Sequence, residues 1–217
     1  MSQIAIDGPA GAGKSTVAKE VARRLGFMYV DTGAMYRTIA LECIRSGVDT
    51  ADEEAVSRVC ENSQISVRYI DSIQHMYIAG EDVSSLIRSE EAGKGASDVA
   101  RYAAVRTKLV SLQRQLAEEY DVVMDGRDIC SCVLPSAEVK IFLTASSECR
   151  AKRRYDELIS KGQNADLCRI REDIEKRDHQ DSHRKLSPLK KADDAVLIDS
   201  SDMSIDEVAD KVISLWK

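Results

Sequence analysis

Short, continuously apolar runs recur along the chain and are separated by longer segments. Their length and composition are typical of strands that are buried on both faces of a sheet, as parallel strands are. Four of the five runs end in Asp. The predicted strands are "QIAID" (3–7), "FMYVD" (27–31), "DVVMD" (121–125), "VKIFL" (139–143) and "AVLID" (195–199).

The segments between these runs show the apolar spacing of amphipathic helices. Strands that alternate with helices predict an α/β fold, in which helices cover both faces of a parallel sheet. We therefore expect a parallel five-stranded sheet at the core of the molecule. The predicted helices cover 14–25, 34–45, 97–119 and 204–216.

Two segments break this alternation. Between 65 and 85, apolar and polar residues alternate as they do in half-exposed antiparallel strands, which predicts a small inserted sheet. The stretch 152–165 is highly charged and carries Gly162 in a predicted turn, and we interpret it as a lid. A chain of 217 residues is long enough for one well-buried core, so a single domain is expected to carry both insertions.

The composition is that of a soluble globular protein, with 43% hydrophobic and 31% charged residues. No apolar run approaches the ~20 residues of a membrane span, and the first predicted strand begins too early to leave room for a signal peptide. We expect a cytoplasmic, monomeric protein with no membrane partner. The six cysteines form no C-x-x-C pair, which favours reduced thiols over a zinc site or disulfides.

Charge is distributed unevenly along the chain. The net charge is −6, which argues against a nucleic-acid partner, because such proteins need a basic footprint. Between Glu148 and Lys191, however, 13 Lys and Arg stand against 9 Asp and Glu. A locally basic surface on an acidic protein indicates a small polyanionic ligand.

The stretch "GPAGAGKST" (8–16) follows the first predicted strand and opens the first predicted helix, the context that the P-loop pattern G-x-x-x-x-G-K-[ST] requires. Its glycines let backbone N–H groups turn toward phosphate oxygens, the helix N-terminus adds a favourable dipole, and the lysine adds positive charge. The serine hydroxyl can bind Mg²⁺. The residues expected at the nucleotide phosphates are Gly8, Gly11, Gly13, Lys14, Ser15 and Thr16, with Ser15 at the metal.

A P-loop alone does not define an activity, because switches, motors and kinases share it. Regulatory GTPases read guanine through an N-K-x-D segment, and no such tetrapeptide occurs in this chain. A nucleotide-dependent switch or binding module therefore loses its main support but stays open as an alternative.

Arginines occur at helical spacing or beside strand ends. Planar guanidinium groups suit bidentate contacts to phosphate. Transfer of a phosphoryl group between two phosphates needs such cations and no general base, since the acceptor phosphate is already largely dianionic at neutral pH. A stripe of arginines is also typical of a solvated helix face, and this alternative stays open for Arg150, Arg153 and Arg154. The other arginines are Arg37, Arg127, and Arg177 and Arg184, which share a helix face with Asp181.

Over nearly its whole length the chain resembles the bacterial-type cytidylate kinases of the nucleoside monophosphate kinase group. The resemblance rests on motifs in the order and approximate spacing of that family: "AIDGPAGAGKST", "VDTGAMYR", "DGRD", "KIFLTASSECRAKRR", "KRDHQDSHR" and "PLKKADDAVLIDSSDMSIDEV". It implies transfer of a phosphoryl group from ATP to CMP and dCMP, with Mg²⁺. It also implies a core (about 1–32, 99–150 and 166–217), a monophosphate-binding part (33–98, its inserted sheet at 64–85) and a lid (151–165).

Residue by residue, the resemblance implies roles for the polar side chains outside the P-loop. The catalytic set is Lys14, Arg127, Arg150, Arg154 and Arg184. Thr32, Arg37, Arg127 and Arg184 match positions at the acceptor phosphate; Ser97, Arg106 and Asp128 match contacts to cytosine; and Arg177 and Asp181 match contacts to the ribose.

The assignment of Asp128 also agrees with the chemistry of the base. A carboxylate accepts a hydrogen bond from the exocyclic amine of cytosine, whereas uracil presents a carbonyl at that place. A pairing of Asp128 with Arg127 or with a helix end is the structural alternative. A kinase for UMP, AMP or a phosphate-free metabolite is the alternative activity.

Three places depart from the family pattern. Cys130 and Ser131 follow "DGRDI" where Gly and Thr are usual, and Cys130 would add strain if that backbone had a positive φ. Ala103 and Ala104 replace a usual proline, and "GKGA" (93–96) adds glycines to a predicted helix.

Overall fold

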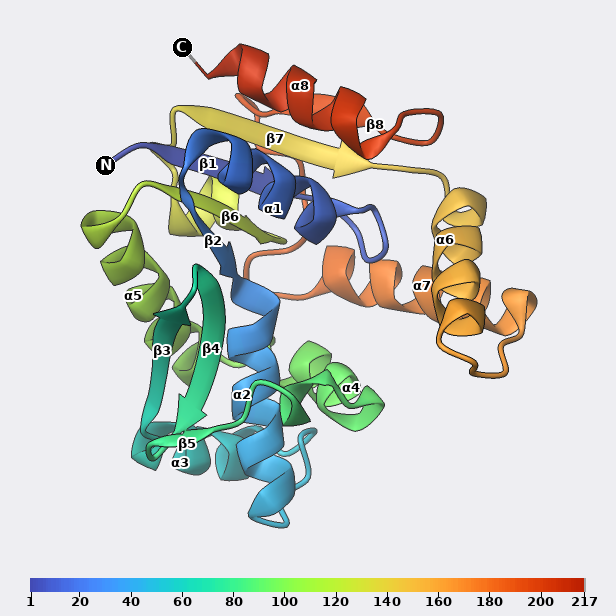
Figure 1. Ribbon diagram of the computed structural model, residues 1–217. Helices are drawn as coiled ribbons and strands as arrows, with labels where there is room; N and C mark the ends of the chain where they lie inside the picture. Colours follow the sequence, from blue (N-terminus) through green and yellow to red (C-terminus); the bar gives the residue numbers. More distant parts are fainter. Residues whose placement is uncertain (217) are drawn as a thin grey trace. The chain divides into compact units, whose positions relative to one another are not determined.

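The computed structural model describes residues 1–216, and the chain divides into two compact units. One unit contains Met1 and residues 28–122, and the other contains residues 2–27 and the chain from Val123 onward. Both units contain helices and strands (Figure 1). The predicted five-stranded sheet is confirmed, with the strand order β2-β6-β1-β7-β8.

The second unit holds most of this sheet and two helices that pack on it. In the sheet, β1 pairs parallel with β7, and β7 pairs parallel with β8. Helices α1 and α8 pack on each other and contact β1 and β7, respectively (Figure 1). The elements are β1 (Gln3–Asp7), α1 (Lys14–Leu25), β6 (Val122–Gly126), β7 (Val139–Thr144), β8 (Val196–Asp199) and α8 (Ile205–Leu215).

The core of the second unit contains fully buried apolar residues from three neighbouring strands. Ile4 and Ile6 of β1, Ile141 and Leu143 of β7, and Ile198 of β8 have no exposed surface. In β1 every residue after Gln3 is buried, which is the reason that this strand reads as an unbroken apolar run, whereas in β8 Ile198 alone is buried. The short helix η2 (Ile129–Val133) follows β6.

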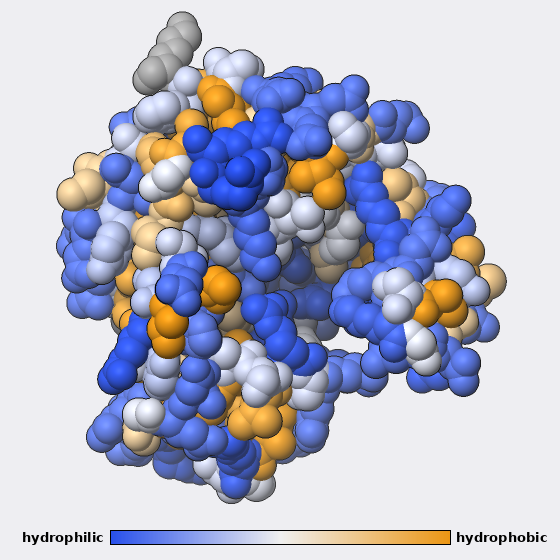
Figure 2. All heavy atoms as spheres, viewed as in Figure 1, coloured by the Kyte–Doolittle hydropathy of each residue, from blue (hydrophilic) through white to orange (hydrophobic). Residues whose placement is uncertain are grey.

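Two charged helices, α6 (Ser147–Ser160) and α7 (Leu167–His183), pack against each other in the second unit. The side chain of Ser146 caps the first of them and that of Asp166 caps the second, because each accepts a hydrogen bond from a first-turn N–H. Hydrophilic residues dominate the surface over α6 in Figure 2. The segment 151–165 therefore consists of most of α6 and its connection to α7.

The first unit is built around helix α2, which packs against α4, α5 and β4. Residues 65–82 form an antiparallel sheet in which β4 lies between β3 and β5. The elements are β2 (Met28–Asp31), α2 (Thr32–Arg45), α3 (Glu53–Asn62), β3 (Ile65–Ile70), β4 (Ile73–Ile78), β5 (Glu81–Asp82), η1 (Leu86–Arg88), α4 (Glu90–Val99) and α5 (Ala103–Glu119).

The prediction of one helix over 97–119 is wrong, because two helices meet there. Helix α4 ends at Val99, and the backbone of Tyr102 is extended, with φ −94° and ψ 133°, before α5 begins. The hydroxyl of Tyr102 donates to the carbonyl oxygen of Thr50 at 3.0 Å. Residues 99, 102, 105 and 109 are all buried, so the apolar spacing continues across the break.

Cys130 occupies its unusual position without backbone strain. Among the described residues, the non-glycine residues with positive φ are Asp71, Ser72, Ala79 and Ser187. The Cys130 side chain is buried, with Sγ within 3.6 Å of the carbonyl oxygens of two neighbouring strands. All six cysteines are free thiols.

Candidate active site

The P-loop joins β1 to α1 in the second unit and depends on glycine at both of its ends. A Cβ atom at Gly8 would lie 1.9 Å from the carbonyl oxygen of Leu143, so no other residue fits there. Gly13 caps α1 with a left-handed backbone (φ 85°), and Gly11 lies between them in the loop. The turn therefore brings the backbone onto the sheet and starts the helix at Lys14.

Lys14 is buried beneath this loop, where its ammonium group donates to the carbonyl oxygen of Pro9 at 2.8 Å. Burial and, to a smaller extent, the positive charge of Arg127 lower the pKa of Lys14 to about 7, against the opposing effect of Asp125. An anionic ligand at the loop would reverse this shift, because it stabilises the charged form. A bound phosphate would therefore raise the pKa of Lys14 and favour its protonated form.

Ser15 and Asp125 form the polar pair that best fits a magnesium ion. The hydroxyl of Ser15 donates to Oδ2 of Asp125, at the end of β6, at 3.0 Å. Among residues 1–216, no cluster of three or more His, Cys, Asp and Glu side chains is placed to bind a metal. Mg²⁺ is usually held by one or two oxygen ligands together with substrate phosphates and water, so this sparse pair fits it. Thr16 follows in the first turn of α1.

Two ion pairs connect the segment after β6 with the C-terminal end of α7. Nε of Arg127 donates to Oδ2 of Asp181 at 2.8 Å. One guanidinium nitrogen of Arg184, the residue that follows α7, lies 3.4 Å from Oδ1 of Asp128. All four side chains were predicted as substrate contacts, and the structure brings them together in two pairs.

Burial and charge act in opposite directions on the first of these pairs. Burial alone would raise the pKa of Asp181, but the guanidinium of Arg127 beside it holds that pKa below its ordinary value. Conversely, burial would lower the pKa of Arg127, and Asp181 raises it. Both groups are therefore charged at neutral pH and form a fixed anchor rather than a proton-transfer pair.

Asp7, which sequence reasoning did not assign to the site, binds the backbone of the segment that follows β6. Its two carboxylate oxygens accept hydrogen bonds of 2.8 Å from the backbone N–H groups of Ile129 and Cys130. Burial raises the pKa of Asp7 to about 6, against the opposing effect of these hydrogen bonds. The backbone that follows Asp128 is thereby fixed to the strand that leads into the P-loop.

The arginines of α6 have different environments. Arg150 is buried and donates to the carbonyl oxygen of Ala10 in the P-loop at 2.9 Å. Arg154, in contrast, is about half exposed and pairs with Glu157 at 2.7 Å. Arg153 donates to the backbone oxygen of Ser200 at 2.6 Å. The open alternative of a solvated helix face thus does not describe Arg150 or Arg153.

In the first unit, the start of α2 brings predicted phosphate contacts together. Thr32 is the first residue of α2, and Asp31 caps the helix through a 2.8 Å hydrogen bond from the backbone N–H of Ala34. Arg37 lies one turn on, 3.9 Å from the Asp31 carboxylate. Its NH1 atom is buried without a hydrogen-bond partner among the described residues. Since buried charged donors are normally paired, this nitrogen fits an anion.

The two predicted base contacts of the first unit lie on separate helices that both pack on α2. Ser97 is in the last turn of α4 and is half-buried. Arg106 is in the first turn of α5, buried, with NH1 3.5 Å from the hydroxyl of Tyr36 on α2. Their placement on different helices follows from the break at residues 100–102.

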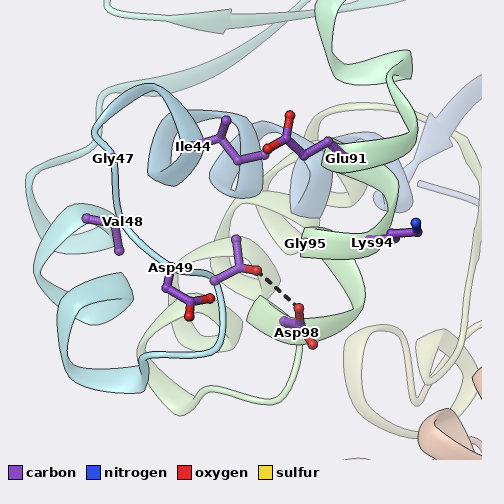
Figure 3. A pocket seen from close by; sticks show the side chains of 9 residues that line it. Ile44, Gly47, Val48, Asp49, Glu91, Lys94, Gly95 and Asp98 are labelled. Carbon is purple, nitrogen blue, oxygen red and sulfur yellow. Dashed lines mark hydrogen bonds between the residues drawn. The ribbon is translucent and has the colours of Figure 1, made fainter.

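A pocket of about 460 Å³ lies in the first unit between α4 and the connection after α2 (Figure 3). Three carboxylates, those of Asp49, Glu91 and Asp98, line it, and Thr50 donates to Asp98 at 3.1 Å (Figure 3). None of the predicted site residues lines this pocket. Its acidic lining makes it unsuitable for a nucleotide phosphate, and we assign it no role in the site.

Asp125 is the functional candidate that sequence reasoning missed. Part of its signal was present, because "DVVMD" ends in Asp and the carboxyl ends of parallel strands meet at one edge of a sheet. The strand order, which places β6 next to β1, was not available from the sequence.

Comparisons with known proteins agree on a single family. The family model for cytidylate kinase matches residues 4–217. A cytidylate kinase of Bacillus licheniformis is 52% identical over 213 residues, covering 98% of this chain and 94% of its own. A cytidylate kinase of Lactobacillus johnsonii is 50% identical over 215 residues, covering 99% and 94%.

Two solved structures share the fold at low sequence identity. An uncharacterized protein from Eubacterium ventriosum has a TM-score of 0.52 and 13% identity, and covers 99% of this chain and 97% of its own. Shikimate kinase from Bacteroides thetaiotaomicron has a TM-score of 0.50, 14% identity and the same coverage. Within residues 1–216, no helix combines the length and apolar character that crossing a bilayer would require.

Proposed function

Because the chain belongs to the cytidylate kinase family, we propose that it transfers the γ-phosphoryl group of ATP to CMP, giving CDP and ADP, and that it also accepts dCMP. The observation that carries this proposal is the pair of ion pairs, Arg127 with Asp181 and Arg184 with Asp128, in the unit that holds the P-loop. They supply guanidinium groups for a phosphate and a buried carboxylate for a base amine.

On the donor side, the P-loop amides and Lys14 bind the phosphates of ATP. Little covalent chemistry is asked of the protein in such a transfer, and catalysis consists of positioning and of offsetting the negative charge. Lys14 adds a charge that burial makes sensitive to the ligand, as its lowered pKa indicates. Arg154, about half exposed in the middle of α6, is available to the phosphates when the segment 151–165 acts as a lid.

Mg²⁺ is the cation that this site would hold. The Ser15 hydroxyl and the Asp125 carboxylate are 3.0 Å apart and are oxygen donors of the kind that Mg²⁺ prefers. When bound, the ion neutralises charge on the donor phosphates. The role of Asp125 is to accept from the Ser15 hydroxyl and so to orient its oxygen.

On the acceptor side, we assign Thr32, Arg37, Arg127 and Arg184 to the phosphate of CMP. The support for Arg37 is its buried NH1 atom, which lacks a hydrogen-bond partner among residues 1–216. A dianionic phosphate is itself the nucleophile, so no side chain has to remove a proton. The three histidines are not required for the reaction.

Recognition of cytosine is assigned to Asp128, Ser97 and Arg106. The side chain of Asp128 is 7% exposed, and an acceptor so buried discriminates strongly between an amine and a carbonyl. Ser97 and Arg106 donate to the ring nitrogen and carbonyl acceptors. Arg177 and Asp181, on one face of α7, are assigned to the ribose. We further propose that the enzyme acts as a cytoplasmic monomer.

Release of ADP, measured in a coupled assay, tests the proposal against a panel of acceptors. The panel contains CMP, dCMP, UMP, AMP and shikimate as a phosphate-free compound. We expect CMP and dCMP to be used with the highest kcat/KM, and CDP to form in amounts equal to ADP. A preference for another acceptor, or ATP hydrolysis that no acceptor stimulates, would overturn the assignment.

A further inference from the structure

Arg150 joins three parts of the second unit through one guanidinium group. Its Nε donates to the carbonyl oxygen of Ala145, just after β7, at 2.9 Å, and its NH1 donates to the carbonyl oxygen of Ala10 in the P-loop at 2.9 Å. The same NH1 lies 2.7 Å from Oδ2 of Asp178 on α7. A Cβ built at Gly11 would lie 3.4 Å from Cβ of Arg150, so the loop also packs on this side chain.

Asp178 is the α7 side chain that forms an ion pair with this group. It follows Arg177 directly and precedes Asp181 by three residues, so it shares a helical neighbourhood with both proposed ribose contacts. Neither the family resemblance nor the proposed function gives Asp178 a role. The path from the P-loop to α7 consists of Ala10, Arg150 and Asp178.

Burial of the Asp178 carboxylate costs free energy of folding, which argues against a purely structural role. Its Oδ1 atom is buried and accepts no hydrogen bond from the described residues. Its side chain is 24% exposed and that of Arg150 is 7% exposed, so both charges are largely removed from water. A buried ion pair is weak evidence for stability, because apolar residues of similar volume often replace it without loss.

We propose that Asp178 is a positioning residue that couples the donor and acceptor sites. By holding Arg150 against the P-loop carbonyl of Ala10, it fixes the acceptor-binding face of α7 relative to the loop that binds ATP. Occupation of the P-loop then favours the arrangement of α7 that binds CMP, and CMP favours the arrangement that binds ATP. This inference rests on the proposed function for the roles of Arg177 and Asp181.

The coupling is measured by titrating CMP into the full-length protein in the absence and presence of a saturating non-hydrolysable ATP analogue. Linkage requires that the gain in CMP affinity equals the gain in affinity for the analogue. In Asp178→Asn we expect this gain to fall by about tenfold, within the usual range of coupling between sites. The affinity for the analogue alone should change by less than about twofold, because the P-loop and its bond to Arg150 remain.

The matched control is Asp173→Asn, which removes an exposed carboxylate from the same helix. This variant should keep the full gain in CMP affinity when the analogue is present. Its melting temperature shows whether loss of a charge on α7 alters the fold. Asp178→Glu retains the charge and should recover part of the gain, and it also keeps the test available if Asp178→Asn unfolds. Steady-state kinetics of Asp178→Asn should show a raised KM for CMP that exceeds any loss in kcat.

Equal gains in the wild type, Asp178→Asn and Asp173→Asn would overturn the inference, as would a wild-type protein that shows no gain. Failure of the proposed function has a different signature. In that case the wild type would not phosphorylate CMP in the ADP-release assay, whatever the binding measurements show. If the wild type makes CDP but Asp178→Asn keeps the full coupling between CMP and the analogue, the role of Asp178 alone would be overturned.

Discussion

The carboxylate of Asp7 accepts a 2.8 Å hydrogen bond from the backbone N–H of Cys130, two residues beyond Asp128. A second bond of 2.8 Å comes from the N–H of Ile129. The end of β1, which leads into the P-loop, is thereby joined to the segment that carries the proposed base-reading carboxylate. Asp7 is buried, so this arrangement places an ionisable group in the interior of the second unit.

Asp7 should make stability depend on pH. Burial raises its pKa from 3.8 to about 6, so the folded state binds the proton more tightly than the unfolded state does. Its contribution to the free energy of unfolding is full below pH 3.8 and is lost as pH rises through about 6, a change of about 3 kcal/mol at most. Between pH 4.5 and pH 7, the free energy of unfolding measured in urea should therefore decline more for the wild type than for Asp7→Asn. Parallel pH profiles would contradict this.

Lys14 should destabilise the protein when no ligand is bound. Burial lowers its pKa from 10.5 to about 7, so its contribution to stability is full above pH 10.5 and is lost as pH falls through about 7. Lys14→Met should raise the free energy of unfolding at pH 6.5 by on the order of 2 kcal/mol, and by less at pH 9, while abolishing phosphoryl transfer. Urea titrations of the two unliganded proteins check this, and a less stable methionine variant would be the contrary result.

Arg37→Met should weaken CMP binding without destabilising the fold. The buried NH1 atom of Arg37 makes no hydrogen bond within residues 1–216, and Asp31, 3.9 Å from it, keeps an ion pair with Arg88 when it is removed. The substitution therefore costs the unliganded protein little. A hydrogen bond to a charged group contributes about 1.5–3 kcal/mol, which corresponds to a rise in KM for CMP of about 10- to 150-fold. The control is Arg58→Met, at an exposed position of α3, whose KM should remain that of the wild type. An unchanged KM in Arg37→Met would exclude this arginine from the phosphate site.

Asp128→Ala should narrow the preference for CMP over UMP. Uracil presents a carbonyl toward this carboxylate, and an unpaired buried acceptor costs about 1–3 kcal/mol, so the ratio of kcat/KM values should fall by about 5- to 150-fold. Because Asp128 also pairs with Arg184, activity toward both acceptors should decline, and the ratio is the informative quantity. Asp193→Ala, at an exposed position, should leave it unchanged. An unaltered ratio in Asp128→Ala would remove this residue from base reading.

The parts of the fold that local chemistry determines could be predicted from the sequence. The apolar runs gave the five strands, and Gly8 to Ser15 gave the P-loop, because each glycine and the lysine has a local physical reason to be there. The break between α4 and α5 could not be seen, since Val99, Tyr102 and Val105 keep a helical spacing across it. A tertiary contact accompanies it, from the hydroxyl of Tyr102 to the carbonyl oxygen of Thr50.

The supporting residues of the candidate site were beyond the sequence for a related reason. Asp125, Asp7 and Asp178 act through partners more than 25 positions away, namely Ser15, Cys130 and Arg150. Such pairings follow from strand order and helix packing, which periodicity does not reveal. Whether Cys130 strains the backbone could likewise not be decided without its backbone angles. The structure shows that its φ is not positive.

The central claim is that a phosphoryl group passes from ATP directly to the phosphate of CMP. It is tested most directly by incubating the protein with γ-³²P-labelled ATP, CMP and Mg²⁺ and separating the nucleotides. The account predicts that the label appears in the β-phosphate of CDP in an amount equal to the ADP formed. Label found only in ATP and inorganic phosphate, with CMP unchanged, would contradict it.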